Sequence, residues 1–430
     1  MRYRISATSK VLTLLCLMYF INYVVRVDVS TAAAVFQPEL HLTNTQVGLV
    51  FSAFAYPYLL FQIVGGWFSD RFGARRALTA FAMIWSSATI LMGVTSTLTG
   101  MIIGRVMLGL GVSALPTATR AMSSWIPAAK RGFAQGITHS CARLGNALTP
   151  PMVAWLILLV SWRGSFVVIG ILGIGWALAW AWYFRDDPTD HPEITPSELA
   201  RLPKPFVLGE AQRRSVPALR LARRMLPVTI VYFCYGWTLW FFLAWIPSYF
   251  LHSYSLKLSD SAMFSAGVFL GGVVGDVLGG VVSDRIFERT GDRKKARRDL
   301  VIGGFLCSVA VTLPVIFVHS LPIVAVCLSA GFFFAEFTVG PMWAIPMDIA
   351  PRSSGLASGF MNSGSALAAI VSPLIGGFIV DKTGRWELTF VAGIGLLLIG
   401  AVLAFWMKPE EELDQADSLL RTAPVPEAAV

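Results

Sequence analysis

The sequence predicts an all-α polytopic membrane protein, with twelve transmembrane helices arranged as two six-helix, pseudo-symmetric halves. Two features lead to this fold class: the composition of the chain and a turn motif that occurs twice. Apolar residues make up 55% of the 430 residues and charged residues only 14%, whereas soluble domains carry about 25% charged residues. Apolar runs of roughly 20 residues, long enough to cross a bilayer as a helix, recur along the whole chain.

Twelve such runs can be placed in order. The first keeps its charged residues at its far end and lacks a small-residue cleavage site, so we read it as a span and not as a signal peptide. Several runs exceed the minimum length, and we expect them to tilt or to continue past the hydrocarbon. The expected spans are 11–35, 45–69, 77–96, 98–121, 131–158, 164–184, 226–252, 260–285, 299–319, 321–348, 352–381 and 386–408.

A basic turn recurs at almost half the length of the chain. The stretch GGWFSDRFGARR covers residues 65–76, and GGVVSDRIFERTGDRKKARR begins at Gly279. Both place an Asp-Arg pair, at Asp70 and at Asp284, after two glycines and a three-residue spacer. Each copy follows the second span of six, which predicts two parallel repeats that pack around a substrate site near the bilayer midplane. The alternative is a pair of loops that are basic only because of the membrane topology.

The net charge of +9 is distributed unevenly between two sets of loops. Such an imbalance is typical of the positive-inside rule. We therefore expect a multi-pass protein of the inner (cytoplasmic) membrane with both termini in the cytoplasm, and no nucleic-acid partner. The sparse set holds Arg163, Lys257, Lys382 and Arg385; the rich set holds Arg2, Arg4, Lys10, Arg71, Arg75, Arg76, Lys130, Arg131 and the arginines of 201–224 and 285–298.

A long polar insertion separates six spans from six. It predicts an N-terminal half over 1–184, a cytoplasmic linker loop over 185–225 and a C-terminal half over 226–408. Residues 409–430 are rich in Glu and Pro, and we expect a disordered cytoplasmic tail there.

The first copy of the turn, GWFSDRFGARR, resembles the signature loop of the major facilitator superfamily, and GVVSDR resembles its degenerate copy. The fourth-span sequence RVMLGLG, which begins at Arg105, resembles a second motif of the superfamily. The resemblance implies the major facilitator fold, a glycine that permits close helix packing, and a cytoplasmic charge latch that helps to set the inward-facing against the outward-facing state. The latch residues that it implies are Gly66, Asp70, Arg71, Gly73, Arg75, Arg76, Asp284 and Arg285.

A narrower resemblance, to the anion:cation symporter family, covers most of the chain. It is carried by INYVVRVDVS, FSAFAYPYLLFQIVGGWFSDR, SSWIP, WTLWFFLAWIPSYF, MWAIPMDIAP and GLASGFMNSGSALAAIVSPLIGGFIVDKTG. Members of that family carry sugar acids such as galactonate, hexuronates and tartrate, or aromatic acids such as phthalate. The resemblance implies a monomeric secondary active transporter that imports an organic anion (a sugar acid, an aromatic acid or a dicarboxylate) by alternating access with proton symport.

Arg26 is the leading candidate for binding the anion. It lies inside the first span, and Asn22 and Tyr23 lie one turn earlier on the same helix face. A guanidinium binds a carboxylate through two parallel hydrogen bonds, and an ionisable residue inside the bilayer is functional by default. The alternative is an arginine paired permanently with a helix end or an internal acid. By resemblance, an arginine at this position contacts the substrate.

The fifth span carries a second polar stripe, with His139 and Arg143 one turn apart. A second cation would suit a substrate with two negative groups, such as a dicarboxylate. The alternative is a structural arginine bonded to Glu336 or to backbone carbonyls. His139 is either a proton relay or a satisfied interior histidine.

Three further contacts follow from the resemblance. Tyr58, one turn from Gln62 in the second span, is expected to contact the substrate, while Trp343 and Asn362 are expected to line the site from the other half. For Trp343 the alternative is a packing or lipid-interface role, whereas an amide such as that of Asn362 in an apolar helix needs a partner.

The carboxylates that relatives use for proton coupling are missing here. Their positions hold Val25 and, allowing a one-residue gap, Val112 or Ser113. Glu336, near the centre of the tenth span, is the first replacement candidate, with His139 as a relay. Asp28 is the second candidate, although it lies about 200° around the helix from Arg26. We hypothesise that Glu336 pairs with a cavity cation in the empty site and takes up a proton when the anion replaces it.

Other charged residues near helix ends are assigned structural roles. Asp276 and Asp348 are expected near the cytoplasmic ends of their spans, as part of the latch, and Arg120 is expected to be structural.

The competing functions are export of an organic anion or drug, and anion sensing without transport on the same fold. The fifth span lacks the Gly-Pro pair typical of drug/proton antiporters, and the 185–225 loop contains no recognisable signalling domain. We expect no enzyme, cofactor or metal, because the sequence has no nucleotide-binding loop, metal-spaced His/Cys cluster or nucleophile motif. Five cysteines, an odd number within apolar runs, predict no disulfide framework.

Overall fold

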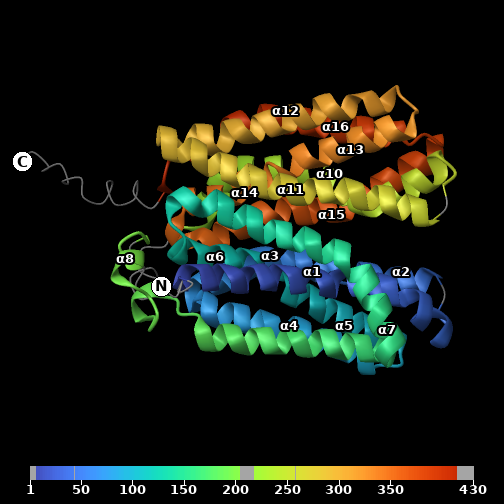
Figure 1. Cartoon of the computed structure of the whole chain (residues 1–430), viewed down its shortest axis with the longest axis horizontal. Coiled ribbons are helices and arrows are strands. Elements are labelled where there is room, and N and C mark those ends of the chain that lie inside the picture. Colours follow the sequence, from blue (N-terminus) through green and yellow to red (C-terminus); the bar gives the residue numbers. More distant parts are fainter. Residues whose placement is uncertain (1–5, 43, 204–216, 257, 414–430) are drawn as a thin grey trace, which may run out of the picture.

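The computed structural model describes residues 6–42, 44–203, 217–256 and 258–413 as a bundle of long helices (Figure 1). Within these ranges, eleven helical segments are long and apolar enough to cross a membrane. One of them contains α7 (Arg131–Tyr183), in which Ser161 has non-helical torsions with φ 76°. The chain turns back at this point (Figure 1), so α7 supplies two spans and the predicted twelve are present.

The other expected spans coincide with one helix or with two or three helical segments that meet end to end. The first half contains α1 (Ala7–Glu39), α2 (Asn44–Ser52), α3 (Ala55–Phe72), α4 (Ala74–Val94), α5 (Leu98–Gly111), η1 (Val112–Ala114), α6 (Leu115–Trp125), η2 (Ala128–Lys130) and α7. The short helices η3 (Pro188–Asp190) and α8 (Pro196–Leu199) follow. The second half contains α10 (Ala218–Ser253), α11 (Leu258–Thr290), η4 (Lys294–Asp299), α12 (Leu300–Thr312), η5 (Leu313–Ile316), α13 (Leu321–Glu336), α14 (Val339–Ile349), η6 (Pro351–Ser353), α15 (Ser354–Thr383), α16 (Glu387–Leu403) and η7 (Ala404–Trp406).

Some sequence expectations cannot be compared with the structure. The tail predicted over 409–430 falls mostly on 414–430, and part of the linker falls on 204–216; these residues lie outside the described ones. The same holds for the topogenic residues Arg2, Arg4 and Lys257.

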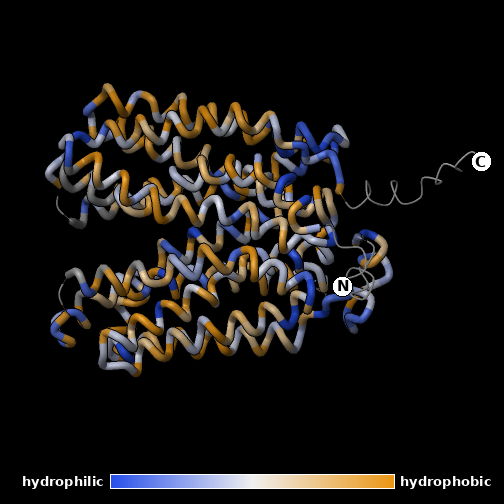
Figure 2. Tube along the Cα trace, turned by 180° about the vertical axis from the view of Figure 1, so that it is seen from behind, coloured by the Kyte–Doolittle hydropathy of each residue, from blue (hydrophilic) through white to orange (hydrophobic). Residues whose placement is uncertain are grey.

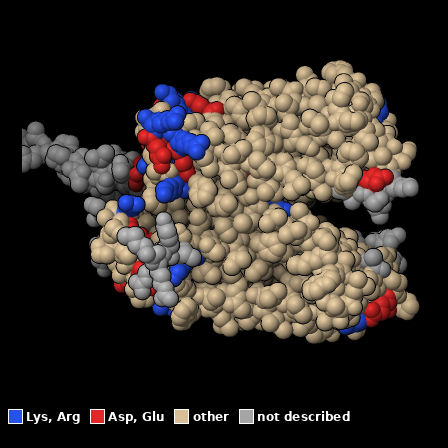
Figure 3. Space-filling model, in the orientation of Figure 1, with Lys and Arg blue, Asp and Glu red and all other residues tan. Residues whose placement is uncertain are grey.

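Charge and hydropathy divide the bundle into an apolar body and polar ends. Hydrophobic residues run along the helices, and hydrophilic ones gather at the helix ends and at a few points between the halves (Figure 2). Both ends of the described chain lie at one end of the bundle, which we call the termini face (Figure 1). Lys and Arg gather there, the two halves touch there, and a deep gap separates them at the opposite, open face (Figure 3).

The termini face is closed by a carboxylate of each half that caps a helix of the other half. Asp70, at the end of α3, accepts hydrogen bonds from the backbone N–H groups of Gly355 (3.1 Å) and Leu356 (2.8 Å), in the first turn of α15. Arg120 of α6 also approaches Asp70, with 3.5 Å between Nε and Oδ1. The first N–H groups of a helix have no partner within the helix, and the helix dipole favours an anion there.

Asp284 makes the equivalent contact from the second half. It accepts hydrogen bonds from the N–H groups of Gly132 (3.0 Å) and Phe133 (2.6 Å), in the first turn of α7. The repeated turn therefore supplies two related caps between the halves. Glycines allow this approach, because a Cβ on Gly66 would overlap the Gly355 carbonyl and one on Gly280 would overlap the Gly132 carbonyl.

The cation beside Asp284 differs from the expected one. Arg285 is exposed, and Arg297 instead lies beside Asp284 (3.1 Å) and Asp348 (3.1 Å). Adjacent residues on a helix point about 100° apart, so Asp284 and Arg285 cannot both face the other half. Arg131 extends this buried network through an ion pair with Asp348 (2.9 Å), which agrees with the latch position expected for Asp348.

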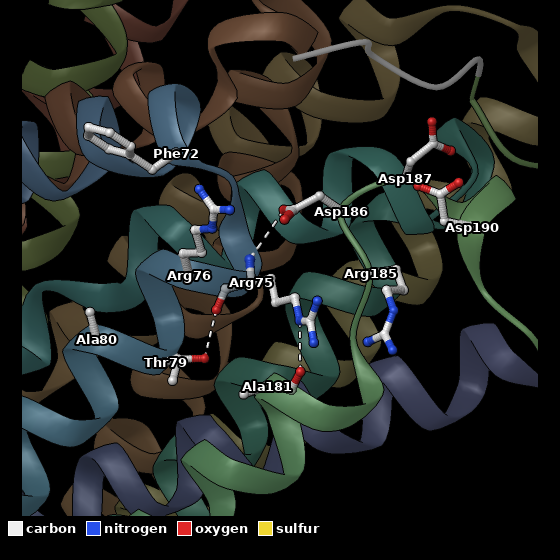
Figure 4. A pocket seen from close by; sticks show the side chains of 10 residues that line it. All are labelled: Phe72, Arg75, Arg76, Thr79, Ala80, Ala181, Arg185, Asp186, Asp187 and Asp190. Atoms are coloured by element: carbon white, nitrogen blue, oxygen red, sulfur yellow. Dashed lines mark hydrogen bonds between the residues drawn. The ribbon is translucent and has the colours of Figure 1, made fainter. Parts of the chain in front are cut away.

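Arg75 and Arg76 line a separate pocket of about 850 Å³ on the termini face, shown in Figure 4. Gly73 ends α3 with φ +86°, a conformation that favours glycine, and the Arg75 N–H donates to Asp186 (3.2 Å). Burial raises the pKa of the Asp186 carboxyl above its usual value. Arg71 is exposed and lies over the rings of Trp67 and Phe72, so the arginines of this motif do not all serve the cap.

Asp70→Asn should shift the termini face toward its open arrangement. Hydrogen bonds to charged groups are worth about 1.5–3 kcal/mol, and about 1.4 kcal/mol changes a population tenfold. We expect the open population to rise about tenfold or more, for Asp284→Asn as well. Spin labels are placed at the exposed positions Ala200 and Arg289 in a cysteine-free background. The distance between them, measured by double electron–electron resonance, reports this population.

The matched control is Asp299→Asn, which removes only a surface pair with the neighbouring Arg298. Its distance distribution should equal that of the unmodified protein. Equal distributions for Asp70→Asn, Asp284→Asn and the control would contradict the capping interpretation.

Candidate functional site

Arg26 lies in the middle of α1, held between two aromatic rings. Its Cζ is 4.6 Å from the ring centroid of Tyr23 and 4.6 Å from that of Tyr58, and the residue is 7% exposed. Its Nη2 donates to the carbonyl of Val112 (3.0 Å), where the fourth span is interrupted between α5 and α6. In the described part of the chain, Nε and Nη1 have no hydrogen-bond partner. Three N–H donors of a buried guanidinium are therefore available to a ligand.

Tyr58 and Asn362 meet across the halves, as the sequence predicts for two residues of one site. The Asn362 amide donates to the hydroxyl of Tyr58 (3.3 Å) and to Oε1 of Gln62 (2.8 Å). Asn22 is fully buried, and both of its amide atoms lack a hydrogen-bond partner among the described residues. An unsatisfied buried amide is costly. The presence of the Asn22 amide on the same helix face as Arg26 therefore indicates a site that a polar ligand completes.

Trp343 and His139 lie next to each other at the same level. Their rings are 4.9 Å apart, and Trp343 donates from Nε1 to the hydroxyl of Tyr232 (2.6 Å). His139 is 2% exposed and packs against Tyr19 on its other side (5.0 Å). Neither ring nitrogen of His139 has a hydrogen-bond partner within the described ranges.

Arg143 belongs to a buried ionic cluster with the tenth span. Its Nε and Nη2 donate to one oxygen of Glu336 (3.1 and 2.9 Å), and Nη2 also donates to the hydroxyl of Tyr235 (3.0 Å). Tyr235 in turn lies 3.0 and 2.9 Å from the two oxygens of Glu336. This is the arginine–Glu336 pairing that the sequence left open as an alternative to substrate binding. The Nη1 of Arg143 is without a hydrogen-bond partner among the described residues.

Asp276 is not part of the latch, contrary to the sequence expectation. Its carboxyl is 3.9 Å from Arg143 and fully buried. The expectation failed because α11 continues from Asp276 for a further 14 residues to Thr290, which places Asp276 deep in the bundle and not at a helix end.

Asp28 lies apart from this cluster, as its angular position on α1 predicts. Its electrostatic partner is Arg105, which donates to the carbonyls of Val50 (3.1 Å) and Phe51 (3.3 Å) where the second span is interrupted. Arg105 therefore supports the junction between α2 and α3. Arg105 and Asp28 are both buried.

The two arginines share one aromatic neighbour. The ring of Tyr23 is 4.6 Å from the guanidinium of Arg26 and 5.8 Å from that of Arg143. The structure thus brings together Asn22, Tyr23, Arg26, Tyr58, His139, Arg143, Glu336, Trp343 and Asn362. Lys or Arg atoms are also visible where the gap between the halves ends (Figure 3).

Sequence reasoning missed two residues of this site, Tyr232 and Tyr235 on α10. They lie three residues apart in one span, so the same-face argument applied to Asn22 and Arg26 could have found them. The position of Asp276 beside Arg143 carries no such signal, because it depends on how α11 packs against α7.

Comparisons with known proteins agree with this architecture. The family model of the Major Facilitator Superfamily matches residues 15–352 and 286–427. A probable sulfoacetate transporter of Cupriavidus necator is 42% identical, over 97% of this chain and 97% of that protein. A hexuronate transporter of Bacillus subtilis is 30% identical, over 89% and 90%, and a D-galactonate transporter of Escherichia coli is 31% identical, over 88% and 90%.

Solved structures show the same fold at low sequence identity. The proton:xylose symporter XylE has a TM-score of 0.74 at 15% identity, over 96% of this chain and 98% of that one. The transporter FucP in its outward conformation has a TM-score of 0.68 at 14% identity, over 92% and 98%. These relatives and neighbours are transporters and not enzymes, as the sequence predicts. The chain belongs to the Major Facilitator Superfamily, as one of its multi-pass membrane transporters.

Proposed function

We propose that this protein imports a small organic anion by alternating access, with Arg26 as its primary anion-binding residue. The observation that carries the proposal is a buried guanidinium, fixed between Tyr23 and Tyr58, with three N–H donors unused. Its fixed orientation favours bidentate binding of a carboxylate or sulfonate. Tyr23, Asn22, Tyr58, Trp343 and Asn362 complete the proposed site.

The substrate class follows from the relatives and from the second arginine. The relatives are named for sulfoacetate, hexuronate and galactonate. Sulfoacetate carries a carboxylate and a sulfonate, two anionic groups that Arg26 and Arg143 on either side of Tyr23 could bind. We therefore place short dianions first among the substrates to test.

We propose that the two halves, 1–184 and 226–408, move relative to each other as rigid bodies. The linker 185–225 joins them, and the tail 409–430 follows the second half. Both termini would face the cytoplasm from the inner membrane, which makes the arrangement described here outward-facing. The Gly66, Asp70 and Asp284 contacts would then hold the cytoplasmic side closed, with Arg71, Gly73, Arg75, Arg76 and Arg285 around them. We propose that the protein acts as a monomer.

Proton symport is proposed on the basis of the Arg143–Glu336 pair. An anion that binds Arg143 would displace Glu336, and the displaced carboxylate would take up a proton because an ionised acid without a partner is costly at that depth. His139, adjacent to Trp343 and without hydrogen-bond partners among the described residues, is the proposed relay. Asp28 stays the second candidate for coupling.

Arg26→Lys should reduce uptake of every accepted anion by about tenfold or more, since an ammonium keeps the charge but loses the two parallel hydrogen bonds. The measurement is uptake of labelled sulfoacetate, galactonate and a hexuronate into proteoliposomes. The exposed Arg289→Lys, far from the site on α11, is the matched control and should be unaffected. Unchanged uptake in Arg26→Lys would place the anion elsewhere, and binding without accumulation in the unmodified protein would identify a sensor.

Arg143→Gln should impair dianions more than monoanions, because only a second anionic group would need Arg143. Its effect on sulfoacetate is compared with its effect on galactonate in the same vesicles. The double variant Arg143→Gln/Glu336→Gln removes the acid that hydrogen-bonds Arg143 together with the arginine, and so separates lost binding from the effect of an unpaired Glu336. Equal losses for both classes of anion in the double variant would exclude the two-arginine site.

Glu336→Gln should keep exchange of labelled for unlabelled substrate and lose most of the accumulation driven by a pH gradient. Exchange requires only binding and alternation, whereas accumulation requires a proton to be carried with the anion. Both are measured in the same proteoliposomes with an imposed gradient. Accumulation at the unmodified level would remove Glu336 from the coupling mechanism, and a wild type indifferent to the gradient would indicate another coupling ion or a uniporter.

A further inference from the structure

Two buried carboxyls share a single arginine in the ionic cluster around Arg143. Glu336 lies 2.9 Å from Nη2 of Arg143, and Asp276 lies 3.9 Å from Nε of the same guanidinium. Both acids have fully buried side chains, and Arg143 is 3% exposed. The cluster therefore contains more acidic than basic groups at a depth where an uncompensated charge is costly.

Helix packing brings the two carboxyls to the same guanidinium. Gly272 lies one turn before Asp276 on α11, and a Cβ there would come within 3.0 Å of the Cγ of Glu336. The backbone of α7 at Gly136 packs against the carbonyl of Asp276 from the other side. The carboxyl of Asp276 is consequently enclosed between α7, α11 and α13, within hydrogen-bonding reach of Glu336.

Two ionised carboxylates could not form that hydrogen bond, because neither has a donor. As a carboxylate, Asp276 would have no hydrogen-bond donor for either oxygen among the described residues. The other titratable groups around the cluster are His139 and the phenols of Tyr23, Tyr232 and Tyr235. Of these, Tyr235 donates to Glu336. A single proton between the acids supplies the missing donor and makes the cluster neutral.

We propose that Asp276 and Glu336 form one proton site, which holds one shared proton when the transporter is empty and a second when an anion occupies Arg143. The second step rests on the proposed function; the shared proton does not. On binding, one negative charge arrives with the anion, Glu336 leaves Arg143, and one proton enters from the open face. The net charge of the cluster is unchanged by this exchange.

The pair also explains how coupling could survive the loss of one acid. In Glu336→Gln the remaining Asp276 can neutralise Arg143 and be protonated in turn, and in Asp276→Asn the remaining Glu336 does the same. Each single variant should therefore keep part of its gradient-driven uptake, and removal of both acids should abolish it.

Infrared spectroscopy of the protein in lipid at neutral pH tests the shared proton directly. The unmodified protein should show the carbonyl stretch of a protonated buried acid, and the band should shift with carbon-13 labelling of aspartate or of glutamate. Asp276→Asn and Glu336→Gln should each lose this band, because the remaining acid pairs with Arg143 as a carboxylate. Exposed Glu288→Gln, on the same helix, should keep it. A band of equal intensity in the wild type and both variants would overturn the proposal.

Transport provides the second readout. Substrate exchange and gradient-driven uptake are compared for the two single variants and for Asp276→Asn/Glu336→Gln. We expect exchange in all three, reduced accumulation in the single variants and none in the double variant. Accumulation at the wild-type level in the double variant would also overturn the proposal. Absence of exchange for every anion in the wild type would instead refute the proposed function and leave the infrared result standing.

Discussion

Each half of this transporter presents a helix N-terminus to a carboxylate of the other half, and the closed termini face depends on these two contacts. Asp70 caps α15 and Asp284 caps α7, and paired glycines bring the backbones close enough for both. The caps satisfy N–H groups that no intrahelical bond can satisfy. Because the bonds cross between the halves, separation of the halves on this face must break them, and their free energy is part of the difference between the two states of the transporter.

The second organising feature is the interruption of the fourth span of each half. In the first half the break at Val112 leaves a carbonyl that Arg26 satisfies; in the second half α13 ends at Glu336, which pairs with Arg143. Non-helical backbone at membrane depth is tolerated where it is buried in protein or lines a cavity. Here both breaks lie beside a buried guanidinium of the first half: Arg26, with unused donors, lies at the break of the first half, and Arg143, already neutralised by Glu336, lies at the break of the second.

The sequence predicted the helices well because length and apolarity decide them. It also placed Arg26 inside a span and Asp70 at the end of one, because each stands in a motif or on a polar helix face. It failed where the outcome depends on packing between helices. Arg285 was expected in the latch together with Asp284, but it is exposed, and Arg297 is the cation beside Asp284. Asp276 appeared to be near a helix end, but α11 is long enough to place it in the core. One sequence alone does not specify which faces of α7, α11 and α13 meet.

In the empty site Arg143 is already compensated by Glu336 and Asp276, so that an anion can bind Arg143 only together with a proton. Calorimetry of anion binding in two buffers of different ionisation enthalpy tests this claim most directly, because the difference in measured heat gives the protons exchanged on binding. Sulfoacetate, as the first anion to test, should bind with net uptake of protons from the buffer, and its affinity should rise as the pH falls. Binding of sulfoacetate with the same heat in both buffers and the same affinity across pH would contradict this coupling.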